Sequence, residues 1–230
     1  MAISWLVPIH DTPEDWLKLC LTSILVEMQD GDECICIDDG SQNRNTIFAL
    51  EQYCDLNPRF RLKRIANNLG VAKALNIGLE MVANEYIARL DADDWNISGR
   101  IQKQMAWWND NPADLIGCDM IAHNDDGKTS LIECHQEKWN EKLLRSYQPI
   151  CFHPTWLIET RVMSGLGGYP VTYPHAEDFA LQCQMFKEGH TFTNCPEVLV
   201  NKRQHANRMS NRYRDIQRDS ATRALKDFLK

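Results

Sequence analysis

Acidic side chains follow two apolar, strand-like segments at the point where each segment ends. Asp38-Asp39 comes directly after Glu33–Ile37, and Asp91-Ala92-Asp93-Asp94 comes directly after Tyr86–Leu90. In an open α/β sheet, ligands bind beyond the carboxyl ends of the strands, so we expect both clusters to converge on one edge. These five carboxylates repel one another unless a cation or hydrogen-bond donors share the charge. Carboxylate oxygens suit Mg²⁺ or Mn²⁺, which keep positions open for substrate phosphates, so the clusters predict a metal–nucleotide site.

Each cluster also has a purely structural explanation, because Asp and Gly commonly form turns after strands. Asp38-Asp39-Gly40-Ser41 taken alone fits such a turn. The second cluster fits it less well, since a four-residue turn does not need three acids. The occurrence of both clusters favours ligand binding over simple turn formation.

The spacing of apolar residues indicates which elements position these clusters. We expect strands at 3–9, 33–37, 60–65 and 86–90, with helices at 13–28, 46–54 and 71–82 between them. Thr12 before Pro13 suits a helix N-cap followed by a first-turn proline. Such β-then-α units predict an α/β fold with a mostly parallel sheet flanked by helices.

The second half of the chain is less regular. Helices are expected at 97–108, 139–147, 178–188 and 215–229, and a strand at 115–123. The chain contains no internal repeat, low-complexity tract or obvious linker. We therefore expect a single domain over 1–230, with halves at 1–95 and 96–210 and a basic C-terminal helix at 211–230.

Composition places the chain among soluble globular proteins. Hydrophobic residues make up 43% and charged residues 25% of its 230 residues, which excludes a disordered or fibrous chain. The longest apolar run, Leu19–Val26, is too short for a membrane span, and no signal peptide is expected. Nine cysteines lack the paired spacing of zinc sites, and Cys34 and Cys36 are expected to face one side of a strand. Reduced thiols in the cytoplasm are the simplest interpretation.

Charge is distributed unevenly along the chain. The net charge of −7 argues against nucleic acid as the main partner. Residues 202–230 carry a net charge of +6, which leaves −13 on the rest. This basic segment suits either peripheral contact with anionic lipid or a plain solvated helix.

Seven short motifs occur in the order and spacing of one large enzyme family. The chain resembles inverting glycosyltransferases of the GT-A fold, in family 2, and the resemblance covers nearly the whole chain. The segments that carry it are Val7-Pro8-Ile9-His10, Ile37-Asp38-Asp39-Gly40-Ser41, Asn68–Gly78, Asp91-Ala92-Asp93, His153-Pro154-Thr155 with Gly167-Gly168-Tyr169, Glu177-Asp178, and His205–Ser210. The chain departs from the family where His10 and Asp11 stand, since an aromatic residue and Asn are common there.

The resemblance implies a Rossmann-like GT-A domain whose nucleotide-binding half is 1–95 and whose acceptor-side half is 96–210. It implies that Asp39, with Asp38 nearby, hydrogen-bonds the base of a nucleotide-sugar donor, and that Pro8 and His10 line the base pocket. The resemblance further implies that Asp91 contacts the ribose or the metal. It also implies that Asp93 binds an Mn²⁺ or Mg²⁺ ion that bridges the donor phosphates. Further donor-side candidates are Asn68, Gly70, Lys73, Asp94 and, as a metal or diphosphate ligand, His205. Lys202, Arg203 and Arg208 are expected near the phosphates.

The same resemblance assigns Asp178 as the general base. Inverting transfer is a single in-line displacement, so a carboxylate must take the proton of the acceptor hydroxyl. Tyr173-Pro174-His175-Ala176 offers an apolar rim that would raise the pKa of this base. Alternatively, Glu177-Asp178 is only the acidic first turn of a helix. The acceptor or sugar side is expected to include Asp94, Trp156, Gly168, Tyr169 and Glu177. Lys73 and His205 also fit solvated positions, Trp156 a core position and Gly168 a simple turn.

The resemblance implies transfer of a hexosyl or N-acetylhexosaminyl group, with UDP the commonest donor nucleotide in the family, to a saccharide or lipid-linked acceptor. Such a reaction belongs to cell-surface polysaccharide or glycolipid synthesis. Two alternatives stay open: a sugar-phosphate nucleotidyltransferase and a non-catalytic nucleotide-sugar-binding module. The first usually has a Gly-rich basic loop after the first strand, where this chain has His10-Asp11-Thr12-Pro13. The second has no need of a base such as Asp178.

Overall fold

The computed structural model describes residues 2–134, 141–205, 208 and 212–229. These residues form one nine-stranded sheet with the order β3-β2-β1-β4-β8-β6-β9-β5, and β7 pairs with β6 at its side. Strands β3, β2, β1 and β4 run parallel. β8 is antiparallel to both β4 and β6, whereas β9 is parallel to β6. The expected α/β fold with a mostly parallel, helix-flanked sheet is confirmed.

The first half follows the expected alternation closely. Its elements are β1 (Ile3–Ile9), α1 (Glu14–Glu27), β2 (Glu33–Asp39), α2 (Arg44–Leu56), β3 (Phe60–Ile65), α3 (Val71–Leu79) and β4 (Tyr86–Arg89). One detail differs, because Pro13 rather than Thr12 is the N-cap of α1 and no side chain caps the helix. The Thr12 carbonyl instead accepts a hydrogen bond from Thr46 Oγ1 at 2.7 Å, which ties the start of α1 to α2.

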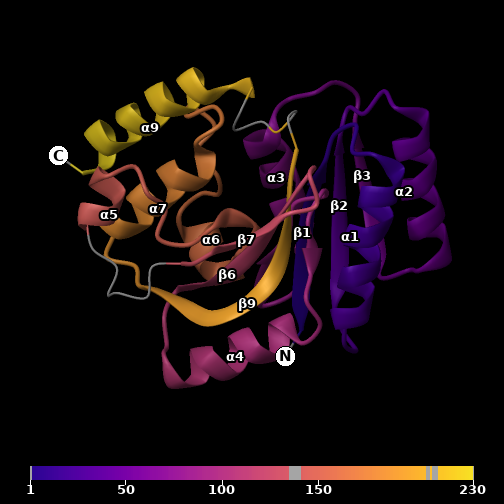
Figure 1. Ribbon diagram of the computed structural model, residues 1–230, viewed down its shortest axis with the longest axis horizontal. Helices are drawn as coiled ribbons and strands as arrows, with labels where there is room; N and C mark the ends of the chain where they lie inside the picture. Colours follow the sequence, from indigo (N-terminus) through magenta and orange to yellow (C-terminus); the bar gives the residue numbers. More distant parts are fainter. Residues whose placement is uncertain (1, 135–140, 206–207, 209–211, 230) are drawn as a thin grey trace.

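The second half extends the same sheet rather than forming a separate body. Its elements are β5 (Trp95–Asn96), α4 (Arg100–Asp110), β6 (Leu115–Asn124), β7 (Thr129–Ile132), α5 (Glu141–Arg145), a 3₁₀ turn (His153–Thr155), β8 (Leu157–Glu159), α6 (Thr160–Gly165), α7 (Glu177–Lys187), β9 (Phe192–Gln204) and α9 (Arg214–Phe228). Trp139, at the start of one expected helix, and Ser210 lie outside the described residues. Figure 1 shows α5, α6, α7 and α9 grouped at one end of the molecule and α1 and α2 at the other.

The sequence patterns did not predict β9, although it is the longest strand. Pro196 interrupts its apolar pattern, and proline cannot donate a hydrogen bond within a sheet. The structure accommodates this residue at a bulge, where the pairing with β6 shifts between Cys118↔Cys195 and Asp119↔Val198. β9 therefore continues past the bulge and carries Lys202 and Arg203 towards the carboxyl edge of the sheet.

Two hydrophobic cores cover the two faces of the sheet. Because side chains alternate along a strand, Cys34 and Cys36 face one core with α1, whereas Ile35 and Ile37 face the other with α3. The expectation that Cys34 and Cys36 share a face is confirmed, and all nine cysteines are free thiols. Gly78 lets α3 approach the sheet closely, since a Cβ there would lie 2.5 Å from Leu6 Cδ1. Within the described residues, none of the helices has both the length and the apolar character needed to cross a membrane.

A buried arginine ties the two halves together below the carboxyl edge. The Arg100 side chain is fully buried, and its guanidinium donates to Asn96 Oδ1 at 2.9 Å and to Gln104 Oε1 at 3.0 Å. It also donates to the carbonyls of Arg89 and Trp156, at 3.1 and 3.3 Å. The end of β4, helix α4 and the turn before β8 are therefore held by one side chain.

We expect Arg100→Met to destabilise the protein by roughly 2–4 kcal/mol, because four buried acceptors would lose a charged donor. The measurement is urea unfolding at equilibrium. Gln102→Ala, an exposed change on the same helix, is the matched control and should stay within about 0.5 kcal/mol of the unaltered protein. Equal stability of the two variants would contradict the assigned role of Arg100.

Candidate active site

Asp38 organises the turn that follows β2. Its carboxylate is fully buried, and Oδ1 accepts the Ser41 N–H at 2.9 Å. Oδ2 lies 3.1 Å from Nε of Arg64 at the end of β3. Both oxygens are thus engaged within the protein, and Asp38 shapes the site rather than facing it.

Asp39 connects this turn to the segment before α3. Its Oδ1 accepts the Leu69 N–H at 2.7 Å, and its Oδ2 accepts the Gly70 N–H at 2.9 Å. Gly70 is the N-cap of α3 with φ of 88°, and the exposed Asn68 side chain also accepts its N–H, at 3.1 Å. Gly40 has φ of 72°, and a Cβ there would lie 2.6 Å from the backbone of Asn67 and Asn68, so the two loops touch through backbone.

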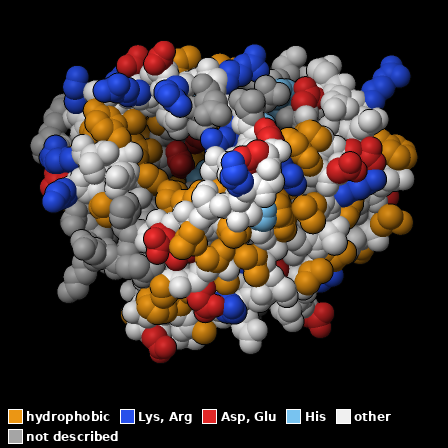
Figure 2. Space-filling model, viewed as in Figure 1, with side chains coloured by type: hydrophobic (Ala, Val, Ile, Leu, Met, Phe, Trp, Pro, Cys, Tyr) orange, Lys and Arg blue, Asp and Glu red, His pale blue; other side chains and the backbone are white. Residues whose placement is uncertain are grey.

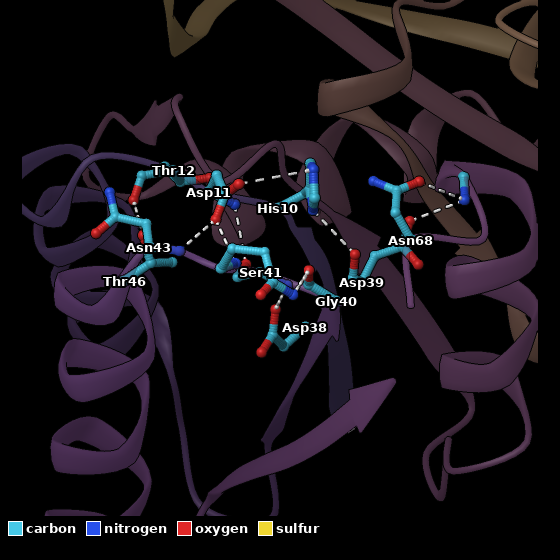
Figure 3. Close-up of polar contacts among 12 residues, drawn as sticks. His10, Asp11, Thr12, Asp38, Asp39, Gly40, Ser41, Asn43, Thr46 and Asn68 are labelled. Carbon is cyan, nitrogen blue, oxygen red and sulfur yellow. Dashed lines mark hydrogen bonds and ion pairs between the residues drawn. The ribbon is translucent and has the colours of Figure 1, made fainter. Parts of the chain in front are cut away.

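The residues after β1 complete this polar cluster, which Figure 3 shows. Nδ1 of His10 lies 2.9 Å from the Asp39 carbonyl, so this nitrogen is the donor, and Nε2 lies 3.9 Å from Asp11 Oδ2. Asp11 Oδ1 accepts the N–H groups of Gln42 and Asn43, each at 2.7 Å. Asp11 adopts a left-handed conformation with φ of 48°. The carboxyl ends of β1 and β2 are therefore locked to each other, with His10 exposed beside them.

At the end of β4, Asp91 pairs with a buried cation. Arg89 Nη1 lies 2.5 Å from Asp91 Oδ1, and Arg89 is only 2% exposed. Burial alone would raise the pKa of Asp91, but Arg89 together with Lys202 lowers it to about 2. Asp91 is therefore ionised across the physiological pH range.

Asp93 and Asp94 lie beside Asp91, but neighbouring cations offset their negative charge less fully. One oxygen from each of the three carboxylates lies within 4.8 Å of the others. Asp94 is buried, and its Oδ2 has no hydrogen-bond partner, although Lys202 Nζ is 3.7 Å away. Burial raises the pKa of Asp94 to about 8, and the charges of Asp93 and Asp91 add to this effect. His205 Nε2 lies 3.2 Å from Asp93 Oδ2. This oxygen-rich donor set with one unpartnered buried oxygen fits a hard divalent cation.

Strand β9 supplies the basic residues of this cluster. The Arg203 N–H donates to Asp94 Oδ1 at 2.8 Å, and its guanidinium lies between the rings of Trp16 and Trp95, 4.6 and 5.0 Å from their centres. The Arg203 Nε also donates to the Asp93 carbonyl at 3.3 Å, so the side chain lies beside the acidic cluster near which the donor phosphates are expected. It holds β9 against α1 and the Asp93-Asp94 segment.

The Glu177-Asp178 pair begins α7, where the helix N-terminus favours acidic side chains. Glu177 is 6% exposed and its Oε2 has no hydrogen-bond partner, whereas Asp178 is half-buried. Burial raises the pKa of Glu177 to about 8, with a further contribution from Asp178. Burial also raises the pKa of Asp178, against the opposing effect of the Phe179 N–H and Arg89. The charge of Asp91 acts on both carboxyls, so this pair lies within electrostatic reach of the first acidic cluster.

Aromatic residues lie beneath these carboxyls. His153 Nε2 is 2.9 Å from the Tyr169 hydroxyl, and Tyr169 stacks on Trp156 with an interplanar angle of 6°. Burial, together with Arg89, lowers the pKa of His153 well below its usual value, so the ring is neutral. Trp156 is fully buried and its Nε1 donates to the Cys151 carbonyl. The interpretation of Trp156 as a sugar-contacting residue is therefore not met in this structure, because the core encloses its ring.

Gly168 and Tyr169 are held by a side chain whose role the sequence did not reveal. Asn76 Oδ1 accepts the Tyr169 N–H at 2.7 Å, and Asn76 Nδ2 donates to the Tyr169 carbonyl at 2.9 Å. Gly168 has φ of 82°, and a Cβ there would lie 2.6 Å from Asn76 Oδ1. Glycine is therefore required by this contact with α3, and Asn76 fixes the turn that precedes α7.

The structure brings together most of the expected site residues. Pro8 is half-buried in β1 opposite Ile37, near the Asp38-Asp39 turn. Lys73 is exposed on α3. Arg89 is a functional residue that the strand pattern of Tyr86–Leu90 does not single out. The signal that could identify it is a charged residue in an otherwise apolar segment, two positions before Asp91. Figure 2 shows a recess near the start of α7, with acidic atoms at its floor and basic side chains along α9 at its rim.

Comparison with known proteins places this arrangement in a family context. The family model described as "Glycosyl transferase family 2" matches residues 4–166. The amylovoran biosynthesis glycosyltransferase AmsE of Erwinia amylovora is 27% identical over 195 residues, which cover 84% of this chain and 72% of AmsE. The O-antigen biosynthesis glycosyltransferase WbnJ of Escherichia coli is 24% identical over 233 residues, which cover 99% of this chain and 89% of WbnJ.

Solved structures of similar fold include S. aureus TarS. The fragment 1–349 in complex with UDP-GlcNAc matches with a TM-score of 0.75 and 16% identity, over 98% of this chain and 67% of that fragment. The same fragment without that ligand matches with a TM-score of 0.73 and is covered to 66%. The chain thus spans about two thirds of the TarS fragment, and the likeness shows a shared fold.

The buried Glu177 carboxyl should make stability depend on pH. Its pKa in the folded protein, about 8, lies above the ordinary value of 4.5, so the folded state retains this proton to higher pH than the unfolded state. The stabilisation is complete below pH 4.5 and is lost as pH rises towards 8, at up to about 1.4 kcal/mol per pH unit.

We expect Glu177→Gln to flatten this pH dependence, because the amide does not ionise. Urea unfolding at pH 5 and pH 7.5 in the presence of a chelator measures it. Glu188→Gln, an exposed change at the other end of α7, should keep the slope of the unaltered protein. Parallel pH profiles for the unaltered protein and Glu177→Gln would contradict the prediction.

Proposed function

Because the chain belongs to glycosyltransferase family 2, we propose that it transfers a sugar from a UDP-linked donor to a saccharide or lipid-linked saccharide, with inversion at the anomeric carbon. The observation that carries this proposal is the presence of two neighbouring acidic sites. One is the Asp91-Asp93-Asp94 cluster. The other is the Glu177-Asp178 pair, in which one buried oxygen of Glu177 has no hydrogen-bond partner and which is close enough for the charge of Asp91 to raise the pKa of Glu177. One site suits a metal diphosphate, and the other suits removal of a proton from an acceptor. The names of AmsE and WbnJ support a role in polysaccharide or O-antigen synthesis.

The proposed donor site lies at the loops after β1 and β2. Asp39 has a second lone pair on each oxygen beyond those used by Leu69 and Gly70, and it accepts a hydrogen bond from the nucleotide base. The exposed ring of His10 lines the base pocket, and Pro8 contributes an apolar surface. A uracil base is supported by the shared fold with TarS, whose structure was solved with UDP-GlcNAc. We propose a hexosyl or N-acetylhexosaminyl group as the sugar.

Asp93, Asp94 and Asp91 are the proposed ligands of a divalent cation, Mn²⁺ or Mg²⁺, with His205 as a further candidate. When bound, such an ion neutralises the negative charge that develops on the departing nucleoside diphosphate. Asp94 loses its proton to become a ligand, because a carboxylate binds metal only when ionised. Lys202 and Arg89 balance the remaining negative charge of the three carboxylates.

Asp178 is the proposed general base. It takes the proton of the acceptor hydroxyl while the oxygen attacks the anomeric carbon and the bond to the diphosphate breaks. Its half-buried position raises its pKa towards the working range of a base yet leaves it accessible. Glu177 keeps its own proton near neutral pH, so it donates a hydrogen bond to the sugar side of the site. Peripheral contact of 211–230 with anionic lipid, and a cytoplasmic location, stay predictions.

Asp178→Asn should lower the rate of sugar transfer by about a hundredfold or more, because the amide cannot accept the proton. Donor binding should persist, since the donor contacts lie at other loops. The measurements are nucleoside diphosphate release and calorimetric titration with the donor. Glu188→Gln on the same helix is the control, and full turnover by Asp178→Asn would refute the assignment.

Asp93→Asn should weaken Mn²⁺ binding by at least about tenfold, because one ionised ligand is lost from the cluster. Electron paramagnetic resonance of free Mn²⁺ measures the affinity directly, without a turnover assay. Asp125→Asn, in the exposed turn between β6 and β7, is the matched control. Unchanged Mn²⁺ affinity in Asp93→Asn would rule out Asp93 as a ligand.

The test of the function itself is a thermal-shift screen of UDP, GDP, dTDP and CMP sugars with and without Mn²⁺, followed by a product assay. A donor that binds only the folded state raises the melting temperature by mass action. We expect a UDP sugar with Mn²⁺ to do so and to release UDP when an acceptor is added. Pyrophosphate release from a nucleoside triphosphate and a sugar phosphate would indicate nucleotidyl transfer instead. Binding without any product release would indicate a non-catalytic module.

A further inference from the structure

The segment 172–176, directly before the Glu177-Asp178 pair, contacts the C-terminal helix α9. Tyr173 is buried, and its hydroxyl donates to Asp227 Oδ2 at 2.9 Å. Arg223 Nη2 donates to the Thr172 carbonyl at 2.9 Å, and its guanidinium lies 5.7 Å from the Tyr173 ring centre. Two residues of α9 thus hold the backbone and the side chain of this segment.

The third contact lies closest to the carboxyl pair. The His175 ring stacks on Tyr213, the N-cap of α9, with ring centres 4.1 Å apart and planes within 5°. His175 has φ of 62°, a left-handed conformation that costs free energy for a residue with a Cβ. The next residue, Ala176, is the N-cap of α7 and donates its N–H to the Tyr173 carbonyl at 3.1 Å. The turn that leads into Glu177 and Asp178 therefore packs, through His175, against the ring of Tyr213 at the start of α9.

The contacts of α9 with 172–176 are separate from the packing of α9 into the hydrophobic core. The apolar face of α9 already buries Ala221, Ala224 and Leu229 among the core residues. Tyr213, Arg223 and Asp227 instead bind the loop 172–176 through polar and stacking contacts. Both α7 and α9 lie beyond residues 4–166, the part of the chain that the family model matches.

We propose that α9 is a positioning element for the carboxyl pair: Tyr213, through His175, and Arg223, through Thr172, hold 172–176 in the conformation that aims Glu177 and Asp178 into the site. The catalytic consequence rests on the proposed function, whereas the structural restraint does not. The basic residues of α9 accordingly serve two surfaces, since Arg223 faces the loop and Arg218 faces solvent.

The test compares Tyr213→Ala with Tyr213→Phe, which keeps the stacked ring, and Arg223→Met with Arg223→Lys, which keeps a donor. Hydrogen exchange of peptides covering 172–180 is the first readout. We expect it to be about tenfold faster in Tyr213→Ala and Arg223→Met, with α1–α3 unchanged, because loss of the contacts opens only this segment. Tyr213→Phe and Arg223→Lys should restore most of the protection. Arg218→Gln, an exposed change on the same helix, is the control.

The second readout is steady-state kinetics of sugar transfer. The two disruptive variants should lower kcat by about tenfold with unchanged donor affinity, since each 1.4 kcal/mol of lost positioning corresponds to that factor. Unchanged exchange in 172–180, or faster exchange with unchanged kcat, would overturn the proposal. Faster exchange throughout the chain would also overturn it, because it indicates a general structural role. If the unaltered protein transfers no sugar, the proposed function fails, and hydrogen exchange alone decides whether α9 restrains the segment.

Discussion

The ion pair between Arg89 and Asp91 is the interaction on which the rest of the site depends. The guanidinium is buried at the end of β4, where the strand reaches the carboxyl edge of the sheet. Breaking such a pair would leave an uncompensated buried charge, so the two side chains are held together. The charge of Arg89 acts on Asp91 and on the Glu177-Asp178 pair, opposing the effect of burial on each carboxyl. It also adds to the effect of burial in lowering the pKa of His153. One cation from the sheet thus couples the two acidic sites, which lie in separate halves of the chain.

Five of the acidic residues of the site fall into two groups according to what they bind. Asp11, Asp38 and Asp39 accept backbone N–H groups from neighbouring loops, and they fix the shape of the edge around β1 and β2. Asp94 and Glu177 each keep an oxygen without a hydrogen-bond partner, and burial raises the pKa of both. The first group stabilises the loops at little electrostatic cost, because each charge is satisfied by donors. The second group is kept in an unfavourable state by the surrounding fold, as expected where a ligand or substrate completes the contacts.

Strand β9 and helix α9 bring the C-terminal part of the chain into this arrangement. β9 lies beside β6 in the sheet and delivers Lys202, Arg203 and His205 to the Asp91-Asp93-Asp94 cluster. Arg203 is fixed by Trp16 and Trp95, so the position of β9 depends on α1 and β5 as well as on its pairing. α9 then packs over the segment before α7 (Figure 1). The second half of the chain is therefore needed to complete the metal-side cluster as well as the base side.

The sequence by itself determined where the acidic clusters lie. Short apolar segments bounded by turn residues predict strands, and residues that follow parallel strands must meet at one edge. The placement of Asp38, Asp39 and Asp91 therefore followed from local pattern and chain direction. Only the tertiary structure decided which carboxylates have hydrogen-bond donors on both oxygens and which keep a buried oxygen without a partner. That outcome depends on partners far away in sequence: Arg64 for Asp38, the Leu69 and Gly70 amides for Asp39, and Lys202 for Asp94. Burial of Trp156 and the restraint of His175 by Tyr213 were likewise beyond local pattern, because both depend on how distant elements pack against each other.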